Sequence, residues 1–385
     1  MAGNIARRPD GRWRARYRDA AHREHARHFT RKIDAQRWLD SVSAAIQAGT
    51  YVDPVRSRLT VAELAHEWLT GKINLRPTTL ARYESALTVH VLPRWGPVAL
   101  VRVSHGGIRA WVAELAAAGQ SGASIRKAYG VLSGVLDLAV RDRRIPANPA
   151  AGVDLPPLAT RRRKYLMARQ VEDLAAATGD RQHRLVVLVL AYCGLRWSEL
   201  AALRVGRVDV TRRRLEVVEA VTEINGGRLS WGPPKSHERR GVPLPRFLAE
   251  ELEPHIAGRS PEQLVFGTPS GAVLRNRNAR RDWFNAAATA IGVADLTPHE
   301  LRHTAASLAV SAGANVKAVQ RMLGHASAAM TLDRYADLFD DDLDAVADRL
   351  DTLARAVTDR RSADSVRTND RSADLANGRS TAKAQ

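Results

Sequence analysis

The sequence predicts a multidomain protein that is mainly α-helical with small β-sheets. Its 385 residues exceed the size at which a single hydrophobic core usually keeps growing, so two or three domains are expected. Apolar side chains recur at helical spacing through most of the chain, whereas strand-like alternation occurs around residues 11–18 and 214–231. A segment at 156–164 combines prolines with a run of basic residues, which is typical of an inter-domain linker.

The composition excludes several classes of protein. A hydrophobic content of 45% is enough for folded cores. The longest apolar run, Leu185 to Leu195, spans 11 residues, whereas a membrane-spanning helix needs roughly 18–20. The basic N-terminus has no apolar signal segment, and the single cysteine, Cys193, excludes an internal disulfide and a cysteine-based zinc site. We therefore expect a cytosolic protein without a membrane partner.

The charge balance points to a polyanionic partner. The chain has 59 basic and 41 acidic residues, a formal net charge of +18. Nucleic acid is the commonest partner of so basic a chain. The alternative is that a GC-rich genome encodes arginine freely, since most of the excess is arginine.

Residues 1–55 are predicted to form a DNA-binding β-ribbon followed by a helix. In the run GRWRARYR, alternation places Trp13, Ala15 and Tyr17 on one face of a strand. A helix is expected from about Asp34. The opposite face of the strand carries four arginines, Arg12, Arg14, Arg16 and Arg18. Because four like charges on one short strand repel each other without a counterion, we expect this face to bind a DNA groove rather than to be simply solvated.

Residues 60–155 are predicted to form a compact domain of four helices. The first begins with a capping box, Thr60 to Glu63. The second follows Pro77, and we expect Pro93 and Gly96 to break it. The third and fourth are marked by apolar stripes at helical spacing, with Ser124 as the expected N-cap of the fourth. These stripes comprise Ile108, Trp111, Val112 and Leu115, then Ile125, Tyr129, Leu132, Leu136 and Val140.

Residues 165–356 are predicted to form a mixed domain. Helices are expected around 168–176 and 184–193, followed by a strand at 214–221. Asn225-Gly226-Gly227 is a hairpin signal, after which strands are expected at 228–231 and 241–244. The rest is expected to be helical to about 356. The polar residues 357–385 are expected to be a disordered tail.

The segment HELRH, residues 299–303, fits the zinc-protease pattern H-E-x-x-H. Such a site needs a third ligand, but positions 306 and 309 are alanine and no glutamate follows Glu300. Aspartates do follow, so an aspartate ligand stays open. Glu300 also completes a capping box with Thr297, and His303 is equally compatible with a buried packing role. We therefore predict no metal site here.

A second chemistry fits these residues better. Cleaving a phosphodiester without a metal requires a nucleophile, cations on the nonbridging oxygens and an acid for the leaving oxygen. Arginine suits the oxygens because its planar fork donates bidentately and stays charged. Lysine or histidine can transfer the proton. The chain offers Arg196, Lys235, His299, Arg302, His325 and Tyr335 for these tasks, in that order.

The motifs around these residues resemble those of the tyrosine recombinase family, specifically phage- or prophage-type integrases. They are GLRWSEL, the hairpin Lys235, HELRHT, MLGHAS and TLDRY, with Tyr335 ten residues after His325. One such motif arises often by chance, but five in order are specific. The resemblance covers most of the chain. It implies an arm-site binding domain at 1–55, a SAM-like core-binding domain at 60–155 and a catalytic domain at 165–356.

The resemblance also implies roles for individual residues. Arg196 and Arg302 would clamp the scissile phosphate. Tyr335 would attack it, forming a 3′-phosphotyrosyl link and freeing a 5′-hydroxyl. Lys235 would protonate that leaving oxygen, and this assignment has Arg239 and Arg240 as neighbouring alternatives.

Three further side chains are assigned by the resemblance. His299 would hydrogen-bond the phosphate or help deprotonate the tyrosine, and His325 would donate to a nonbridging oxygen. Glu199 would be the carboxylate that steadies the cationic site. Because the bond energy stays in the ester, religation would need neither ATP nor a metal, and no cofactor is expected.

The expected partner is double-stranded DNA, at attachment core and arm sites, bound by a homotetramer. The resemblance also allows for accessory bending or directionality factors. Protomers would exchange the segment after Tyr335, where the stretch from Leu338 to Leu350 could dock on a neighbour or cover its own domain. Three alternatives stay open: a chromosome-dimer-resolving recombinase, a type IB topoisomerase, and a DNA-binding relative without catalysis.

Overall fold

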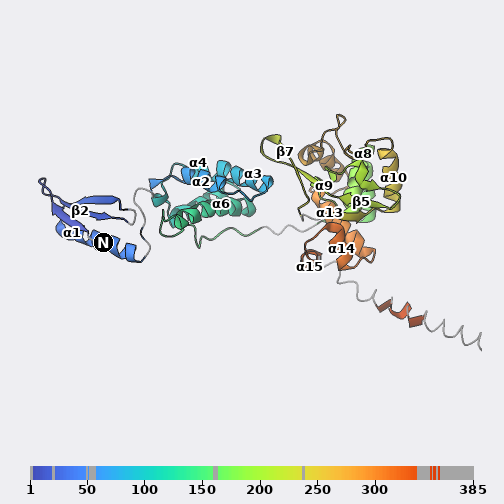
Figure 1. Cartoon of the computed structure of the whole chain (residues 1–385). Coiled ribbons are helices and arrows are strands. Elements are labelled where there is room, and N and C mark those ends of the chain that lie inside the picture. Colours follow the sequence, from blue (N-terminus) through green and yellow to red (C-terminus); the bar gives the residue numbers. More distant parts are fainter. Residues whose placement is uncertain are drawn as a thin grey trace, which may run out of the picture. The chain divides into compact units, whose positions relative to one another are not determined.

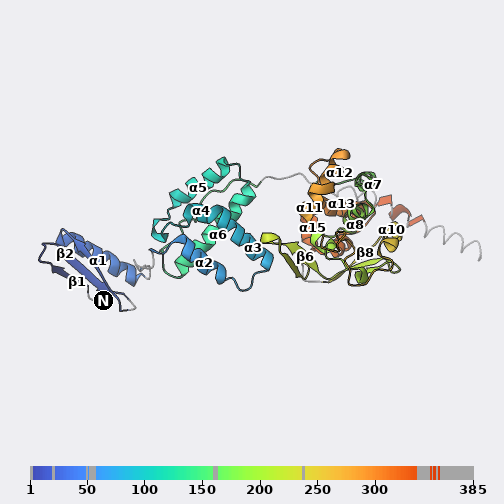
Figure 2. The ribbon, with the colours of Figure 1, turned by 90° about the horizontal axis from the view of Figure 1, so that it is seen from above.

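The structure is a computed structural model that describes residues 3–19, 22–48, 51, 58–158, 164–235 and 239–335, and after these residues 347, 348, 350–352, 354 and 355. Figures 1 and 2 label its elements. The chain divides into two compact units, one of Met1–Arg162 with Glu223–Ser230 and one of Arg163–Thr222 with Trp231–Gln385. The boundary between Arg162 and Arg163 lies inside the predicted linker at 156–164, whereas the assignment of Glu223–Ser230 to the first unit was not predicted. The predicted tail at 357–385 lies outside the described residues, as does most of 336–356.

A three-stranded antiparallel sheet with one helix forms the N-terminal part. Strand β2 (Trp13–Arg18) pairs with β1 (Asn4–Arg7) on one side and β3 (Glu24–Phe29) on the other, and α1 (Lys32–Gln47) covers one face. Ala15 and Tyr17 on β2 are buried with Ala35 and Leu39 of α1 in a small core. The alternation in β2 and the helix were predicted. Strand β1 was not, because its four residues show no alternation of apolar and polar side chains.

The helical part that follows has its own core. Its elements are α2 (Val61–Thr70), α3 (Pro77–Ala86), α4 (Leu92–Trp95), α5 (His105–Ala117) and α6 (Gly122–Arg141). The predicted stripes of the third and fourth helices contribute Ile108, Trp111, Ile125, Leu132 and Leu136 to this core. The capping box at Thr60 and Glu63 is confirmed, since Thr60 N donates to the Glu63 carboxylate over 2.7 Å and Thr60 Oγ1 accepts from Glu63 N.

Two local predictions in this part were wrong. Pro93 does not break its helix, because the π-helical turn Leu87–Val91 joins α3 to α4 and places Pro93 in the first turn of α4, where a missing N–H is tolerated. The N-cap of α6 is Ser121 rather than Ser124. The Ser121 hydroxyl accepts from the Ser124 backbone N–H over 3.2 Å, so the helix starts earlier than its apolar stripe does.

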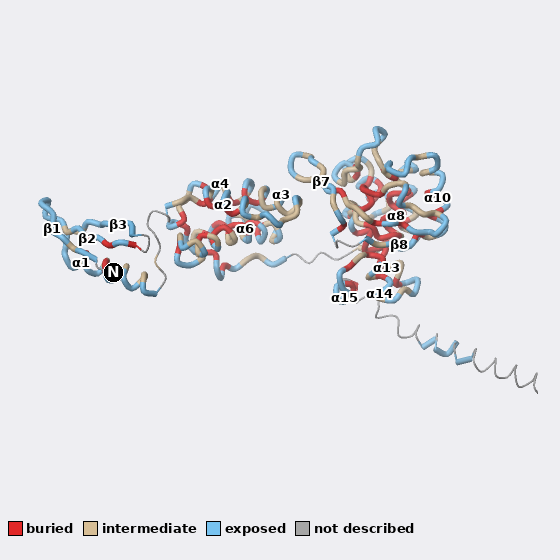
Figure 3. The backbone as a smooth tube through the Cα atoms, viewed as in Figure 1, coloured by how far each residue is buried: buried red, intermediate tan, exposed pale blue. Residues whose placement is uncertain are grey.

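The second unit is built around helix α8 (Arg181–Cys193), whose residues from Leu185 to Ala191 are all buried. It packs against α7 (Ala168–Ala177), α10 (Arg246–Ile256) and α13 (Pro298–Ser311). Figure 3 shows buried backbone concentrated at α8 and α13. None of the helices in the described part of the chain is long and apolar enough to span a membrane.

Two small sheets lie in the strand-rich segment. Strands β4 (Val208–Asp209), β5 (Arg214–Val217) and β8 (Arg240–Pro243) form one, and β6 (Ala220–Glu223) with β7 (Leu229–Gly232) forms the other. The single strand predicted at 214–221 is therefore two strands in different sheets. The hairpin turn and the strand near 241–244 occur as expected, and Gly226 and Gly227 have positive φ.

The remaining described elements complete this unit. They are α9 (Trp197–Leu200), α11 (Asn276–Ala279), the π-helical turn Arg280–Phe284, α12 (Asn285–Ala290), α14 (Val316–Leu323) and α15 (Ala328–Tyr335). The candidate catalytic residues lie directly before α9, in the first half of α13, shortly after α14 and at the end of α15, except Lys235, which lies on the connection from β7 to β8.

Candidate active site

Helix α13 positions two side chains of the candidate site on its buried face. Pro298 occupies the first helical position, and the Glu300 carboxylate accepts the Thr297 backbone N–H over 2.6 Å. This capping fixes where the helix begins. Arg302 and His303 then face the core, whereas His299 is exposed.

Arg302 is held by the ends of two other helices. Its residue surface is 2% exposed, and its Nη1 donates to the Gly194 carbonyl over 2.6 Å. Its Nη2 donates to the Leu323 carbonyl. Both carbonyls lie at helix C-termini, where unsatisfied acceptors and the helix dipole favour a cation. Burial, and then the nearby charge of Arg196, lower the pKa of Arg302 to about 9.

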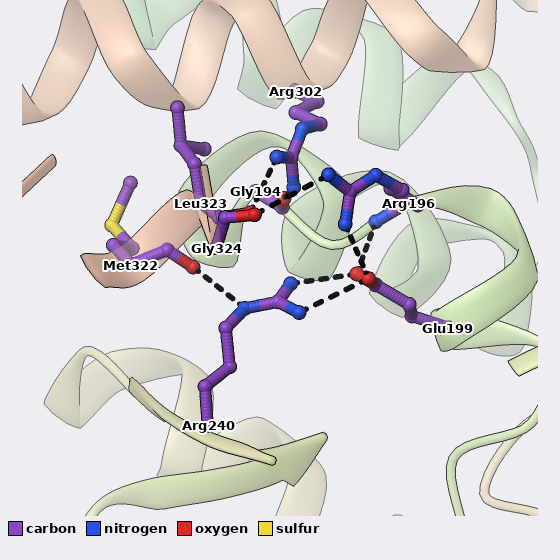
Figure 4. A network of polar contacts seen from close by, with 8 residues as sticks. All are labelled: Gly194, Arg196, Glu199, Arg240, Arg302, Met322, Leu323 and Gly324. Atoms are coloured by element: carbon purple, nitrogen blue, oxygen red, sulfur yellow. Dashed lines mark hydrogen bonds and ion pairs between the residues drawn. The ribbon is translucent and has the colours of Figure 1, made fainter. Parts of the chain in front are cut away.

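Glu199 joins two further arginines. Its Oε1 accepts from Arg196 Nη1 over 2.7 Å and from Arg240 Nη1 over 3.0 Å. Its Oε2 accepts from the Arg196 backbone N–H over 2.9 Å and from Arg240 Nη2 over 2.6 Å. Burial alone would raise the pKa of this carboxyl, but the hydrogen bond and charge of Arg240, together with Arg196, lower it to about 2. Figure 4 shows this network.

The C-terminal end of α14 binds all three arginines through successive carbonyls (Figure 4). Met322 O accepts from Arg240 Nε over 3.1 Å, Leu323 O accepts from Arg302, and Gly324 O accepts from Arg196 Nη2 over 3.5 Å. Gly324 caps the helix with φ +64, a conformation that favours glycine.

This cluster has an excess of positive charge. The guanidinium groups of Arg196 and Arg240 share the Glu199 carboxylate, whereas that of Arg302 donates to backbone carbonyls, which carry only partial charges. Burial is the main cause of the lowered pKa of Arg302, and the charges of Arg196 and Arg240 lower it further because both disfavour its protonated form. Of the three side chains, Arg196 is the most accessible, with 22% of its side chain exposed. The geometry therefore suits an anion that arrives beside Arg196.

Tyr335, the last residue of α15, lies among histidines. It is 1% exposed, and its hydroxyl is 2.8 Å from His303 Nδ1. The His325 ring stacks near the tyrosine ring with centroids 6.2 Å apart and an interplanar angle of 8°, and His325 Nδ1 is 2.9 Å from Thr331 Oγ1. His299 extends the row, since its ring centroid lies 5.0 Å from that of His303. A phenol, imidazoles and a cationic cluster thus meet in one region.

Two family models match the chain. The model described as the Phage integrase family matches residues 164–341, and that described as Phage integrase, N-terminal domain, matches residues 1–48. Together they match more than half of the chain. The chain is a tyrosine recombinase of the phage integrase family.

Individual relatives agree with this family. The integrase of Mycobacterium phage L5 is 27% identical over 345 residues, which is 85% of this chain and 90% of the relative. Among solved structures, the Tn1549 transposon integrase in complex with a circular intermediate DNA superposes with a TM-score of 0.65 at 22% identity, covering 76% of this chain and 99% of that one. A lambda integrase tetramer bound to a Holliday junction superposes with a TM-score of 0.53 at 18% identity, and the match covers 85% of this chain and 94% of that one. These likenesses show that the recombinase has the integrase fold.

The zinc-protease alternative does not fit the donor set in this recombinase. His303 contacts the Tyr335 hydroxyl, and the Glu300 carboxylate is occupied by the start of its own helix. Among the residues that the structure describes, no group of three or more histidine, cysteine, aspartate or glutamate side chains is arranged to hold a metal ion.

Lys235 lies on a connection between two strands. It is exposed, directly after Pro233-Pro234 on the connection from β7 to β8, and residues 236–238 of this connection are outside the described residues. Its place beside a phosphate therefore stays a prediction. Arg240, one neighbouring alternative, is already bound to Glu199 and Met322.

The N-terminal arginines lie mostly where alternation placed them. Arg14, Arg16 and Arg18 are exposed on β2, whereas Arg12 precedes the strand and its backbone N–H donates to Asp10. The charge argument for a DNA groove is weaker than expected. Glu24 on β3 pairs with Arg14 over 3.2 Å and with Arg16 over 3.7 Å, so the protein supplies part of the counterion itself.

Two residues of the site were missed in the sequence. Arg240 was considered only as a substitute for Lys235, because nothing local shows that β8 lies beside α9 and α14. His303 was considered only as a zinc ligand or a packing residue. Its helical spacing puts it one turn after His299, but the hydrogen bond to Tyr335 joins residues 32 positions apart, which local periodicity cannot show.

Proposed function

We propose that the cationic cluster binds the scissile phosphate of DNA and that Tyr335 attacks it. The recombinase cuts and rejoins DNA at specific sites through a tyrosine, as its family does. The observation that supports the assignment is the meeting of a buried phenol with a cluster of three arginines, two of which share the Glu199 carboxylate while the third is held by backbone carbonyls. A phosphodiester supplies the missing negative charge.

The reaction is balanced without a cofactor. The Tyr335 oxygen bonds to phosphorus while the bond to the 5′-oxygen breaks, leaving a 3′-phosphotyrosyl link. The phenol proton passes to an imidazole, and the leaving oxygen takes a proton from Lys235 and departs as a hydroxyl. Arg196 and Arg302 neutralise the nonbridging oxygens, and His325 donates to one of them. Reversal of these steps on another strand completes the exchange.

His303 is the imidazole that receives the phenol proton in this proposal. Its Nδ1 lies 2.8 Å from the Tyr335 oxygen, which is within reach for proton transfer. The sequence allowed His299 either to bind the phosphate or to take the phenol proton. Its side chain is exposed, and its ring contacts that of His303, which lies between it and the Tyr335 hydroxyl. We therefore assign His299 to the phosphate.

The 1% exposure of Tyr335 has a consequence for the reaction. A phosphate reaches the phenol only after α15 shifts, so DNA binding is coupled to a local rearrangement. The segment after Tyr335, predicted to pass to a neighbouring protomer, lies largely outside the described residues.

Double-stranded DNA is the proposed substrate, bound by four protomers. The lambda integrase tetramer on a Holliday junction and the Tn1549 integrase on DNA support this proposal by similarity of fold. Residues 1–55 would bind arm sites, 60–155 the core site, and 165–356 would hold the catalytic residues. Accessory bending or directionality factors belong to the same proposal.

The experiment that tests the nucleophile uses a suicide DNA substrate bearing the attachment core, which a direct repeat flanking the gene would identify. The wild-type chain should form a covalent adduct at the 3′-phosphate. Tyr335→Phe should form none, whereas the control Tyr192→Phe, which removes a different partly buried phenol, should react normally. An adduct with Tyr335→Phe, or none with the wild type, would show that the proposal is wrong.

Two further outcomes separate the alternatives. Relaxation of supercoiled DNA without site preference would favour a type IB topoisomerase. Deleting residues 1–55 should preserve core-site cleavage but impair integration that requires arm sites. Equal integration by the truncated chain would contradict the arm-binding role and favour a chromosome-dimer-resolving recombinase.

A further inference from the structure

Arg240 has contacts that the assigned roles do not explain. It is the first residue of β8, where pairing with Val217 of β5 fixes its backbone. Its side chain is 8% exposed and extends between Glu199 and the end of α14. Long charged side chains are rarely buried this far unless they are paired, so its partners identify what it does.

The first partner is Glu199. Arg240 donates from both Nη atoms to both carboxylate oxygens, over 3.0 and 2.6 Å, in a bidentate pair that fixes the carboxylate plane. The same two oxygens accept from the side chain and backbone of Arg196. Without Arg240, the carboxylate is free to rotate and to take up the Arg196 fork alone, which would draw Arg196 away from a phosphate.

The second partner is the turn that leads to His325. Arg240 Nε donates to the Met322 carbonyl over 3.1 Å. A Cβ placed on Gly324 would lie 2.9 to 3.1 Å from the Cδ, Nε and Cζ atoms of Arg240, so the guanidinium lies directly against this glycine. His325 is the next residue, and its position depends on this turn.

We propose that Arg240 is a positioning residue that holds Arg196 and the Gly324–His325 turn in register around the phosphate without contacting the phosphate itself. The inference rests on the proposed function. It assigns to Arg240 the task of joining the upstream half of the site, Arg196 and Glu199, to the downstream half at α14. Each of its three nitrogens donates to a protein acceptor, Nη1 and Nη2 to Glu199 and Nε to the Met322 carbonyl, so its described contacts all connect parts of the site.

The first measurement is single-turnover cleavage of the suicide substrate by the full chain. Arg240→Met, which keeps the length of the side chain but loses the fork, should cleave about 10- to 100-fold more slowly, the usual cost of losing a supporting contact behind a functional group. Arg240→Lys should recover little of this rate, because a lysine keeps the charge but cannot form the bidentate pair. The control Arg246→Met removes an exposed arginine of the same unit and should cleave normally.

Modified substrates distinguish positioning from other roles. A methylphosphonate at the scissile position removes one negative charge, so it reduces the need for a correctly placed Arg196. On this substrate the cleavage rates of Arg240→Met and wild type should differ by only a few-fold. The same should hold for the cleavage rates of Arg196→Ala and wild type. A 5′-bridging phosphorothiolate, whose leaving group needs no acid, should rescue Lys235→Ala but not Arg240→Met. Rescue of Arg240→Met by the phosphorothiolate would overturn the inference, because Arg240 would then be the acid.

A double-mutant cycle tests the route through Glu199. If Arg240 acts through that carboxylate, Glu199→Gln combined with Arg240→Met should be no slower than the slower single variant by more than a few-fold. Fully multiplicative losses would contradict this route.

A folded Arg240→Met variant that cleaves at the wild-type rate would refute the positioning role, provided that the wild type forms its Tyr335 adduct. Absence of that adduct would instead refute the proposed function, so the two failures are distinguishable. Circular dichroism and the melting temperature establish that the variant is folded. If Arg240→Met does not fold, Arg240→Lys can be tested instead with the methylphosphonate substrate. If its cleavage rate stays as far below that of the wild type as on the ordinary phosphate, the inference is overturned.

Discussion

Replacing Glu199 by glutamine removes the carboxylate that Arg196 and Arg240 share. The amide keeps the size of the side chain but cannot balance Arg196 and Arg240, and its NH₂ group would face a guanidinium. Glu199 has 0% of its side chain exposed and Arg240 has 8%, so water cannot reach this pair to solvate the guanidinium charges that the carboxylate balanced. We expect Glu199→Gln to destabilise the unit that contains Arg163–Thr222 and Trp231–Gln385.

The magnitude follows from the pKa of Glu199, which lies at about 2 instead of 4.5. At about 1.4 kcal/mol per unit, this difference corresponds to about 3 kcal/mol of stabilisation of the ionised form. Removing one partner of a buried ion pair costs about 3–5 kcal/mol in general. The partial exposure of Arg196 favours the lower end, and we expect a loss of about 3 kcal/mol in the free energy of unfolding near neutral pH.

The assay is urea unfolding of the full chain, with hydrogen exchange to identify the transition of the catalytic unit. Because the folded pKa of Glu199 is lowered, its stabilisation is fully present above pH 4.5 and is lost as the pH falls toward about 2. At about pH 3.5 the gap between wild type and Glu199→Gln should therefore have narrowed by about 1.4 kcal/mol. A loss below about 1 kcal/mol near neutral pH, or a gap that stays constant below pH 4.5, would refute the reasoning.

A matched control is Glu251→Gln. Glu251 also pairs with an arginine, Arg184 at 3.0 Å, but the two side chains are 36% and 31% exposed. Ion pairs at this exposure contribute about 0–1 kcal/mol. This variant should therefore lose less than about 1 kcal/mol, and a loss equal to that of Glu199→Gln would show that burial is not the deciding factor.

Four further outcomes follow from the structure. Gly324→Ala should destabilise the fold by about 1–3 kcal/mol, since alanine is strained at φ +64 and its Cβ would press on Arg240; a melting curve at the wild-type temperature would contradict this. Cys193 should resist alkylation by iodoacetamide until urea unfolds the chain, because burial raises its pKa to about 12; rapid labelling of the folded chain would show that this site opens. Arg302→Lys should slow cleavage by about 10²–10³-fold because the planar guanidinium that donates to the Gly194 and Leu323 carbonyls is lost; a rate near that of the wild type in suicide-substrate kinetics would contradict this. Arg18→Gln should reduce the salt slope of arm-site binding by about 0.9 if Arg18 contacts a phosphate, and an unchanged slope would contradict that contact.

Much of the local structure was predictable from the sequence. Helices α5 and α6 follow apolar stripes, and the Thr60 capping box marks the start of α2, because these signals depend on residues three or four positions apart. Local rules failed at Pro93, because the π-helical turn Leu87–Val91 changes the spacing of the backbone hydrogen bonds and lets the helix continue through the proline. They also failed for the 214–221 strand, where the choice of sheet depends on partners distant in sequence.

The candidate site divides in the same way. The sequence by itself was enough to propose Arg196, Arg302, His325 and Tyr335 as site residues, because each lies in a short motif and the motifs follow one order. It determined equally that the segment around His299 lacks a third zinc ligand of the usual types.

Only the tertiary structure decided how these motifs support one another. Arg240 meets Glu199 across 41 positions, Glu24 reaches Arg14 from the neighbouring strand, and His303 meets the Tyr335 hydroxyl from another helix. Each contact joins side chains whose distance is set by the packing of β8 against α9, by the packing of α13 against α15 or by strand register. A sequence motif specifies which chemical groups are present, whereas the balance of charge around them depends on neighbours that only folding brings together.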